Sequence, residues 1–144
     1  MQSLRWTFCL LFTVSLQLEA DTWKAGTAKA DITPQKPIWM AGYGGRTAPS
    51  DGMIHPLWAK ALALEDATGK RAVIIATDTL GMTGPIYDVL KTRLAHAYKL
   101  QPDQIQINAS HTHTGPVLRG GLYDIYPLDA KRLQVIEEYS GRLE

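Results

Sequence analysis

The hydrophobic positions along the chain fall into short segments that alternate between a strand pattern and a helix pattern. Arg71–Thr77 (RAVIIAT) contains an apolar run rich in β-branched residues, which is typical of a buried strand. Pro85–Lys99 carries apolar residues every three to four positions, which predicts a helix with proline in its first turn. Further strands are predicted at Trp23–Asp31, Leu57–Glu65 and Gln104–Ala109, and a second helix at Leu128–Glu138. This order of elements predicts an α/β fold with a mixed β-sheet and flanking helices.

Two polar or glycine-rich segments separate these elements. Asp66–Lys70 lies between two strand segments and contains a glycine near its end, so the two strands are predicted to form a β-hairpin. Met40–Gly52 contains four glycines and a proline, and is therefore predicted to be a loop. Its first part, MAGYGGR, lets backbone N–H groups approach an anion or a carbonyl oxygen closely, but lacks the strand–loop–helix context of a nucleotide-binding fingerprint. An ordinary mobile loop is the alternative interpretation.

The first twenty residues predict a secretory signal peptide. Arg5 precedes a mostly apolar run, Trp6–Leu16, and Ala20 is the small residue that signal peptidases require. The run is short for a membrane span, and a buried first helix is the alternative interpretation. Cleavage after Ala20 would remove Cys9, the single cysteine of the chain. The mature chain, residues 21–144, is therefore expected to be secreted or periplasmic and to contain no disulfide.

Composition excludes several classes of protein. A chain of 144 residues with 45% hydrophobic and 20% charged residues can bury the core of one domain. Fifteen Lys and Arg against fourteen Asp and Glu give a formal net charge of +1, so the strong basic excess of a nucleic-acid-binding protein is missing. One cysteine excludes a disulfide framework and any cysteine-rich zinc module.

The most informative segment for chemistry is NASHTHTG, at Asn108–Gly115, which follows the last predicted strand. In extended backbone the side chains of His111 and His113, two positions apart, would project from the same face. Two imidazoles at the carboxyl end of a strand lie where α/β folds hold ligands, and neutral imidazole suits zinc. The alternative is a pair of surface histidines in a polar loop.

Two charged residues near the strand ends are further candidates. Asp78 directly follows a predicted buried strand, where its carboxylate would orient the second ring nitrogen of His111 or cap the helix that follows. Arg119 follows the histidine segment and would hold an anionic intermediate or lie at the surface. Because the strands before Asp78 and His111 are predicted to be parallel neighbours, we expect both residues and the glycine-rich loop to border one crevice.

Five segments together resemble the N-terminal domain of the neutral/alkaline non-lysosomal ceramidase family. They occur in the order AGTAKADITP, MAGYGGR, IHPLWAKALALED, RAVIIATDTLGM and INASHTHTGP, and they span about Ala25–Pro116. The most specific of them is SHTHTGP after a strand. Members of that family are secreted or surface zinc hydrolases that cleave the amide bond of N-acylsphingosine.

The resemblance implies a role for each matching residue. His111 would be a zinc ligand, and His113 would line the catalytic pocket and hydrogen-bond the substrate or the intermediate. Gly42 and Tyr43, in the glycine-rich loop, would border the substrate pocket. Arg119 follows the matching segments, and its candidate place at that pocket comes from its position after the histidines. The expected substrate is ceramide or a related lipid or small amide, reached at a membrane surface through that substrate, and no nucleic-acid partner is expected.

The resemblance also implies that part of the site lies elsewhere. The family's other zinc ligands are a second histidine, a glutamate and a tyrosine, and these, like its pocket serine, have no counterpart that can be located here. Because a catalytic zinc normally has three protein ligands, we expect this chain to be the N-terminal part of a larger catalytic domain and inactive by itself. Two alternatives stay open, a secreted non-catalytic binding module and a metal-dependent hydrolase of other amides or esters.

Overall fold

The predicted strands and helices are all present in the computed structural model, which describes residues 22–144. The predicted signal peptide, Met1–Ala20, lies outside the described residues. Along the chain the elements are β1 (Lys24–Asp31), β2 (Trp58–Glu65), β3 (Arg71–Thr77), α1 (Gly84–Tyr98), the 3₁₀ turn η1 (Pro102–Gln104), β4 (Ile105–Ala109) and α2 (Ala130–Leu143).

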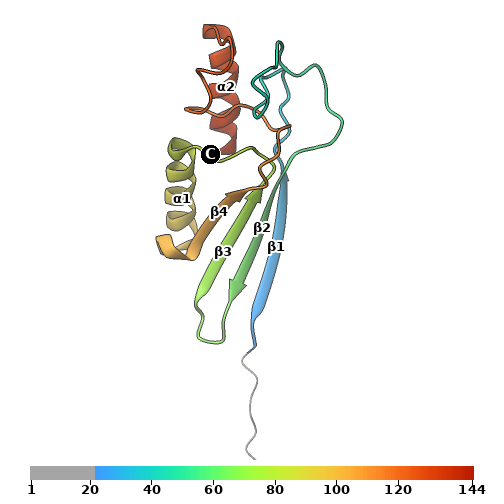
Figure 1. Cartoon of the computed structure of the whole chain (residues 1–144). Helices are drawn as coiled ribbons and strands as arrows, with labels where there is room; N and C mark the ends of the chain where they lie inside the picture. Colours follow the sequence, from blue (N-terminus) through green and yellow to red (C-terminus); the bar gives the residue numbers. More distant parts are fainter. Residues whose placement is uncertain (1–21) are drawn as a thin grey trace, which may run out of the picture.

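The sheet is mixed, as predicted. Its strand order is β1–β2–β3–β4, with antiparallel pairing of β1 with β2 and of β2 with β3, and parallel pairing of β3 with β4. The hairpin between β2 and β3 closes on the Asp66 side chain, which accepts hydrogen bonds from the backbone N–H groups of Thr68 and Lys70, both at 2.9 Å. Helix α1 makes the crossover that parallel strands need. Figure 1 shows that β1, β3 and β4 all end at the side of the sheet nearer α2.

Two hydrophobic clusters hold the elements together. A smaller one joins α1 to one face of the sheet and includes Ile105 and Ile107 of β4, which are buried. A larger one lies beyond the strand ends, where Ile86 of α1 and Ile136 of α2 are fully buried. It also contains loop residues, namely Ile38, Trp39, Ala41, Val117, Leu118 and Tyr126. The larger core therefore fixes the loops that follow β1 and β4, and these loops carry the candidate site.

Helix α2 continues to Leu143, past its predicted end at Glu138. The predicted end lies before Ser140-Gly141, a pair of residues with low helix propensity. In the fold Tyr139 and Ser140 are buried against the rest of the chain, and this packing outweighs the local preference. The helix begins after Asp129, whose carboxylate accepts a hydrogen bond from the backbone N–H of Arg132 at 2.9 Å.

The sheet is covered on one side only in the described part of the chain. Ile74 of β3, which faces away from the α1 cluster, has 41% of its surface exposed. All eight residues of the edge strand β1 are exposed. Among residues 22–144, no helix has the length and apolar character required to cross a membrane.

Candidate functional site

The two histidines lie in the loop that follows β4, held beside the loop that follows β3. Beyond the last strand pair, Ser110 N–H donates to the Thr77 carbonyl at 2.9 Å and Thr112 N–H donates to the Thr79 carbonyl at 3.2 Å. These two bonds continue the pairing of the chain beyond the ends of β3 and β4. The structure therefore places the histidine segment at the carboxyl end of the parallel pair, as predicted.

His111 is oriented by a backbone carbonyl. Its Nδ1 lies 2.8 Å from the carbonyl oxygen of Leu80. Because a carbonyl oxygen only accepts, Nδ1 carries the proton, and the neutral ring then presents an unprotonated Nε2. Metal-binding histidines characteristically donate their second ring N–H in this way. The backbone of His111 has φ +59°, a left-handed conformation that is uncommon for residues other than glycine and is concentrated at functional sites.

His113 lies beside His111, although the two residues are not in the extended backbone that their spacing suggested. The ring centroids are 5.3 Å apart, with the rings inclined at 71°. The prediction assumed extended backbone, and this is wrong, because β4 ends at Ala109 and His111 is left-handed. The rings come together because the loop turns and packs against its neighbours. His111 is exposed and His113 is half-buried.

The glycine-rich loop forms the second wall of the site. Ala41 N–H donates to the Gly115 carbonyl and Val117 N–H donates to the Trp39 carbonyl, both at 2.7 Å, so the two loops are paired like a short antiparallel ladder. Gly42 has φ +106°, and a Cβ at this position would lie 2.5 Å from Cγ of His113. The ring of His113 therefore occupies the space that the missing side chain leaves. Glycine is required here both for its backbone conformation and for this close approach.

Tyr43 completes the contact with His113. The two ring centroids are 4.9 Å apart in an edge-to-face arrangement, and 57% of Tyr43 remains exposed. A pocket of about 530 Å³ opens next to these loops and is lined by Met40, Arg46 and Thr114 from them. The exposed side chains of Met53 and Ile54 form part of the same pocket. Gly42 and Tyr43, which were expected at the substrate pocket from the sequence, both contact His113, but none of these three residues lines this pocket.

Asp78 takes a different position from the one expected. Its carboxylate accepts a hydrogen bond from Trp58 N–H, and its own N–H donates to the Trp58 carbonyl, both at 2.9 Å. Asp78 therefore ties the end of β3 to the start of β2. Asp78 was the candidate for contacting the second ring nitrogen of His111. The backbone carbonyl of Leu80 makes that contact instead. A carboxylate was expected from residue type alone, whereas a backbone carbonyl has no sequence signal.

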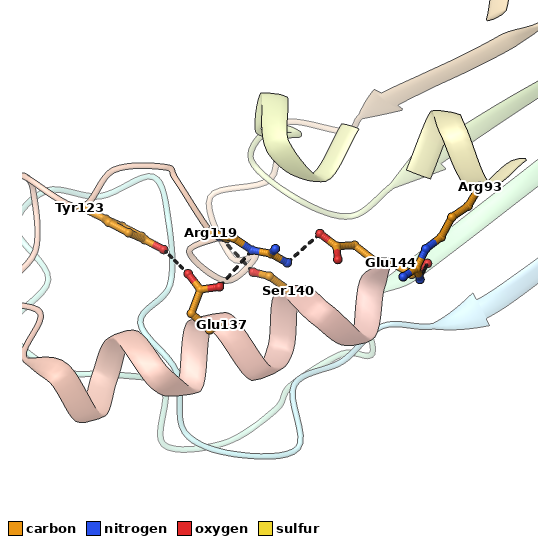
Figure 2. Close-up of polar contacts among 6 residues, drawn as sticks. All are labelled: Arg93, Arg119, Tyr123, Glu137, Ser140 and Glu144. Carbon is orange, nitrogen blue, oxygen red and sulfur yellow. Dashed lines mark hydrogen bonds and ion pairs between the residues drawn. The ribbon is translucent and has the colours of Figure 1, made fainter. Parts of the chain in front are cut away.

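Arg119 also lies outside the group of residues around the histidines. Figure 2 shows it between Glu137 of α2 and Glu144, the residue that follows the helix, with Nε 3.0 Å from Glu137 and Nη2 2.6 Å from Glu144. Its backbone N–H donates to the Ser140 hydroxyl at 2.9 Å. Tyr123 bonds the same Glu137 at 3.2 Å, and burial raises the pKa of the tyrosine hydroxyl. In this structure Arg119 anchors the loop after the histidines to α2.

One residue that sequence reasoning passed over contacts the site directly. Arg46 closes the motif MAGYGGR, and its Nη2 donates to the carbonyl oxygen of His113 at 2.8 Å. The only sequence signal was a charged residue directly after a glycine-rich run. That signal does not reveal the partner, which lies 67 positions further along the chain.

The two histidines by themselves do not make up a metal site. Within residues 22–144, no group of three or more His, Cys, Asp and Glu side chains is placed to hold a metal ion. The chemistry of His111 nevertheless fits a zinc ligand, because its Nδ1 is already hydrogen-bonded and its Nε2 is available.

Comparison with known proteins supports the resemblance seen in the motifs. A family model described as neutral/alkaline non-lysosomal ceramidase, N-terminal, matches residues 23–132. The neutral ceramidase of Pseudomonas aeruginosa is 31% identical over 134 residues, which are 88% of this chain and 20% of that protein. The neutral ceramidase of Drosophila pseudoobscura pseudoobscura is 30% identical over 115 residues, which are 75% of this chain and 16% of that protein.

A solved structure shows the same fold. The crystal structure of neutral ceramidase from Pseudomonas aeruginosa has a TM-score of 0.64 over 86% of this chain and 21% of the other, at 27% identity. This chain thus spans about a fifth or less of the length of the relatives that it matches. Since the family model covers all four strands and both histidines, the chain belongs to the neutral/alkaline non-lysosomal ceramidase family and corresponds to its N-terminal part.

Proposed function

We propose that this chain contributes to a secreted zinc-dependent hydrolase that cleaves the N-acyl amide bond of ceramide or a related lipid amide. The observation that carries the proposal is the oriented ring of His111, with a second imidazole 5.3 Å away. Family membership supports the substrate class, because the similar proteins are neutral ceramidases. The reaction adds water across an amide and yields a carboxylic acid and an amine.

Each histidine has a distinct part in this proposal. His111 holds the zinc through Nε2, and its bond to the Leu80 carbonyl keeps the ring in the required tautomer and direction. Zinc, when bound, polarises the amide carbonyl and lowers the pKa of a coordinated water toward about 7. His113 donates a hydrogen bond to the oxygen on which negative charge develops. Gly42 and Tyr43 keep the His113 ring in place from the opposite loop.

The zinc needs donors that residues 22–144 do not supply. These residues contain no group of three suitable side chains, and a catalytic zinc takes three protein ligands. We therefore propose that the remaining ligands come from another part of the full-length protein, and that the 144-residue chain alone retains little zinc and does not turn over substrate. A hydrolase of other amides or esters and a non-catalytic binding module are the alternatives that the experiment must separate.

The test uses three single variants of the full-length protein. His111→Ala should lose the zinc and the hydrolysis of ceramide together, because it removes a direct ligand. His113→Ala should keep most of the zinc and lose about 10²–10³ in kcat, the effect typical of one lost hydrogen-bond donor to a developing oxyanion. His96→Ala is the matched control, because His96 is an exposed histidine on α1. Zinc is measured by atomic spectroscopy, and turnover by release of the fatty acid.

The outcomes separate the competing interpretations. If His111→Ala keeps full zinc and His113→Ala loses it, the two roles are reversed. If neither variant changes zinc content or rate, the chain is a binding module. Hydrolysis of short amides or esters without hydrolysis of ceramide would support the zinc hydrolase and contradict the proposed substrate class.

A further inference from the structure

Arg46 makes two contacts that converge on His113. Its Nη2 donates to the His113 carbonyl at 2.8 Å, and its guanidinium carbon lies 5.2 Å from the centroid of the Tyr43 ring. The Tyr43 ring in turn meets the His113 ring edge to face. One side chain therefore holds both the backbone of His113 and the aromatic ring that packs against its imidazole.

The charge of Arg46 is not used in an ion pair. Among residues 22–144 the salt bridges involve other cations, and Arg46 Nε is buried without a hydrogen-bond partner. Placing a guanidinium in a half-buried position without a carboxylate is unfavourable unless its other contacts compensate. Arg119, by contrast, has two glutamate partners and serves to anchor α2. The contacts that Arg46 does make are those with Tyr43 and His113.

We propose that Arg46 is a positioning residue that fixes His113 in the candidate site. Gly42 provides the space for the imidazole, Tyr43 packs against its edge, and Arg46 holds the peptide that follows it. The backbone N–H of Arg46 also donates to the Tyr43 carbonyl at 3.2 Å, so the turn itself sets the direction of the arginine. The consequence for catalysis rests on the proposed function, whereas the consequence for the His113 ring does not.

A purely structural role for Arg46 would give a different result. Loop–loop pairing already comes from the backbone bonds at Ala41 and Val117, which do not involve the arginine side chain. Removal of the guanidinium should therefore leave the two loops paired and let the His113 ring move. Displacement of a catalytic group by about 1 Å is enough to lower a rate about 10²-fold.

The experiment has two arms, with the same variants in each. Arg46→Met keeps an unbranched side chain and removes the cation, and Arg46→Lys restores a cation and a donor. Lys29→Met is the matched control, because Lys29 also stacks a cation on an aromatic ring, at 4.5 Å from the Trp58 centroid, but is on the edge strand β1. In the first arm, NMR of ¹⁵N-labelled histidine rings in the 144-residue chain reports the four imidazoles separately. In the second, kcat, KM and zinc content are measured in the full-length protein.

The proposal predicts a specific pattern. Arg46→Met shifts the ring signals of His113 and leaves those of His55 and His96 unchanged, lowers kcat at least tenfold, and leaves KM within twofold and zinc content unchanged. Arg46→Lys recovers part of both effects, and Lys29→Met changes nothing. Wild-type His113 ring signals in Arg46→Met would overturn the proposal, as would unchanged kcat in an active enzyme.

The two arms also separate this proposal from the proposed function. If the full-length protein hydrolyses no N-acyl amide, the proposed function fails, and the ring signals still decide the role of Arg46. If Arg46→Met does not fold, as judged by circular dichroism, the Arg46→Lys variant decides instead. Arg46→Lys should fold and give His113 ring signals between those of wild type and those expected for a released ring. Wild-type ring signals together with a wild-type kcat in this variant would overturn the proposal.

Discussion

At the scale of single residues, the site depends on backbone conformations that few residues tolerate. His111 is left-handed, and Gly42 has a φ of +106° that side chains rarely adopt. At a residue other than glycine, such as His111, strain of this kind is typically about 1–3 kcal/mol and persists only where surrounding contacts enforce it. At His111 those contacts are the bond to Leu80 and the hydrogen bonds of the neighbouring Ser110 and Thr112.

Replacing Gly42 by alanine should disrupt the site at this scale. A Cβ would meet the His113 ring at 2.5 Å, in a backbone conformation unfavourable for alanine. We expect Gly42→Ala to lower the free energy of unfolding by about 1–3 kcal/mol and to displace the His113 ring. Urea unfolding measures the first effect and histidine NMR the second. Gly45→Ala is the control, because a Cβ there meets nothing within 4 Å; equal losses in the two variants would contradict the packing argument.

At the scale of elements, helix α2 is attached to the rest of the chain by polar contacts at its buried side. Tyr139 donates from its hydroxyl to the Ile32 carbonyl at 2.6 Å, which links α2 to the residue after β1. Ser140 accepts from the Arg119 N–H, which links the helix to the segment after the histidines (Figure 2). The helix thereby holds the ends of two loops that border the site.

Removing the Tyr139 hydroxyl should weaken this attachment. Tyr139→Phe leaves the Ile32 carbonyl without its partner and should lower the free energy of unfolding by about 1–3 kcal/mol, measured by denaturant unfolding. Tyr98→Phe, at a tyrosine that is 59% exposed, is the control and should change it little. A Tyr139→Phe variant as stable as wild type would show that the hydroxyl makes no net contribution.

The same hydroxyl predicts a dependence on pH. Burial raises the pKa of Tyr139 above its ordinary value, so the folded state keeps the proton at pH values where the unfolded chain has lost it. Stability from this group is therefore complete below about pH 10, the pKa of an exposed tyrosine, and is lost as the pH rises further. As the pH is raised from neutral to above about pH 10, the free energy of unfolding should therefore fall less in Tyr139→Phe than in wild type.

At the scale of the whole molecule, the described residues form a sheet with one open face and an exposed edge strand. The edge strand β1 carries Lys24 and Lys29, and charged residues on an edge discourage pairing with other chains. Lys24 bonds Glu65 at 2.8 Å, and this bond raises the pKa of the lysine and lowers that of the glutamate. A pair so exposed adds little to stability.

The predicted export of the protein also belongs to this scale. We propose that Met1–Ala20 directs secretion and is removed, because Arg5, the apolar run and Ala20 have the pattern of a signal peptide. Mass spectrometry of the exported protein should find Asp21 at its N-terminus. Exported protein that retains Met1 would contradict cleavage.

Local pattern alone determined the elements of this fold and the position of the histidine motif. The run Arg71–Thr77 and the helical spacing after Pro85 predicted β3 and α1 to within a residue, because burial of one face imposes its period directly on the sequence. The mixed sheet follows from their order, and the five family motifs predicted the family that the comparisons show. The end of α2 was missed, since burial of Tyr139 extends the helix through an unfavourable Ser-Gly pair.

Only the tertiary structure decided which groups surround the histidines. Leu80 orients His111 through a carbonyl that every residue possesses, and Asp78 and Arg119 found other partners, on β2 and on α2. Arg46 reaches the site from 67 residues away. A sequence pattern records whether a position is buried and with what period, but a hydrogen bond between distant segments depends on distance and direction. Those are set when the loops pack around the larger core, and no local pattern contains them.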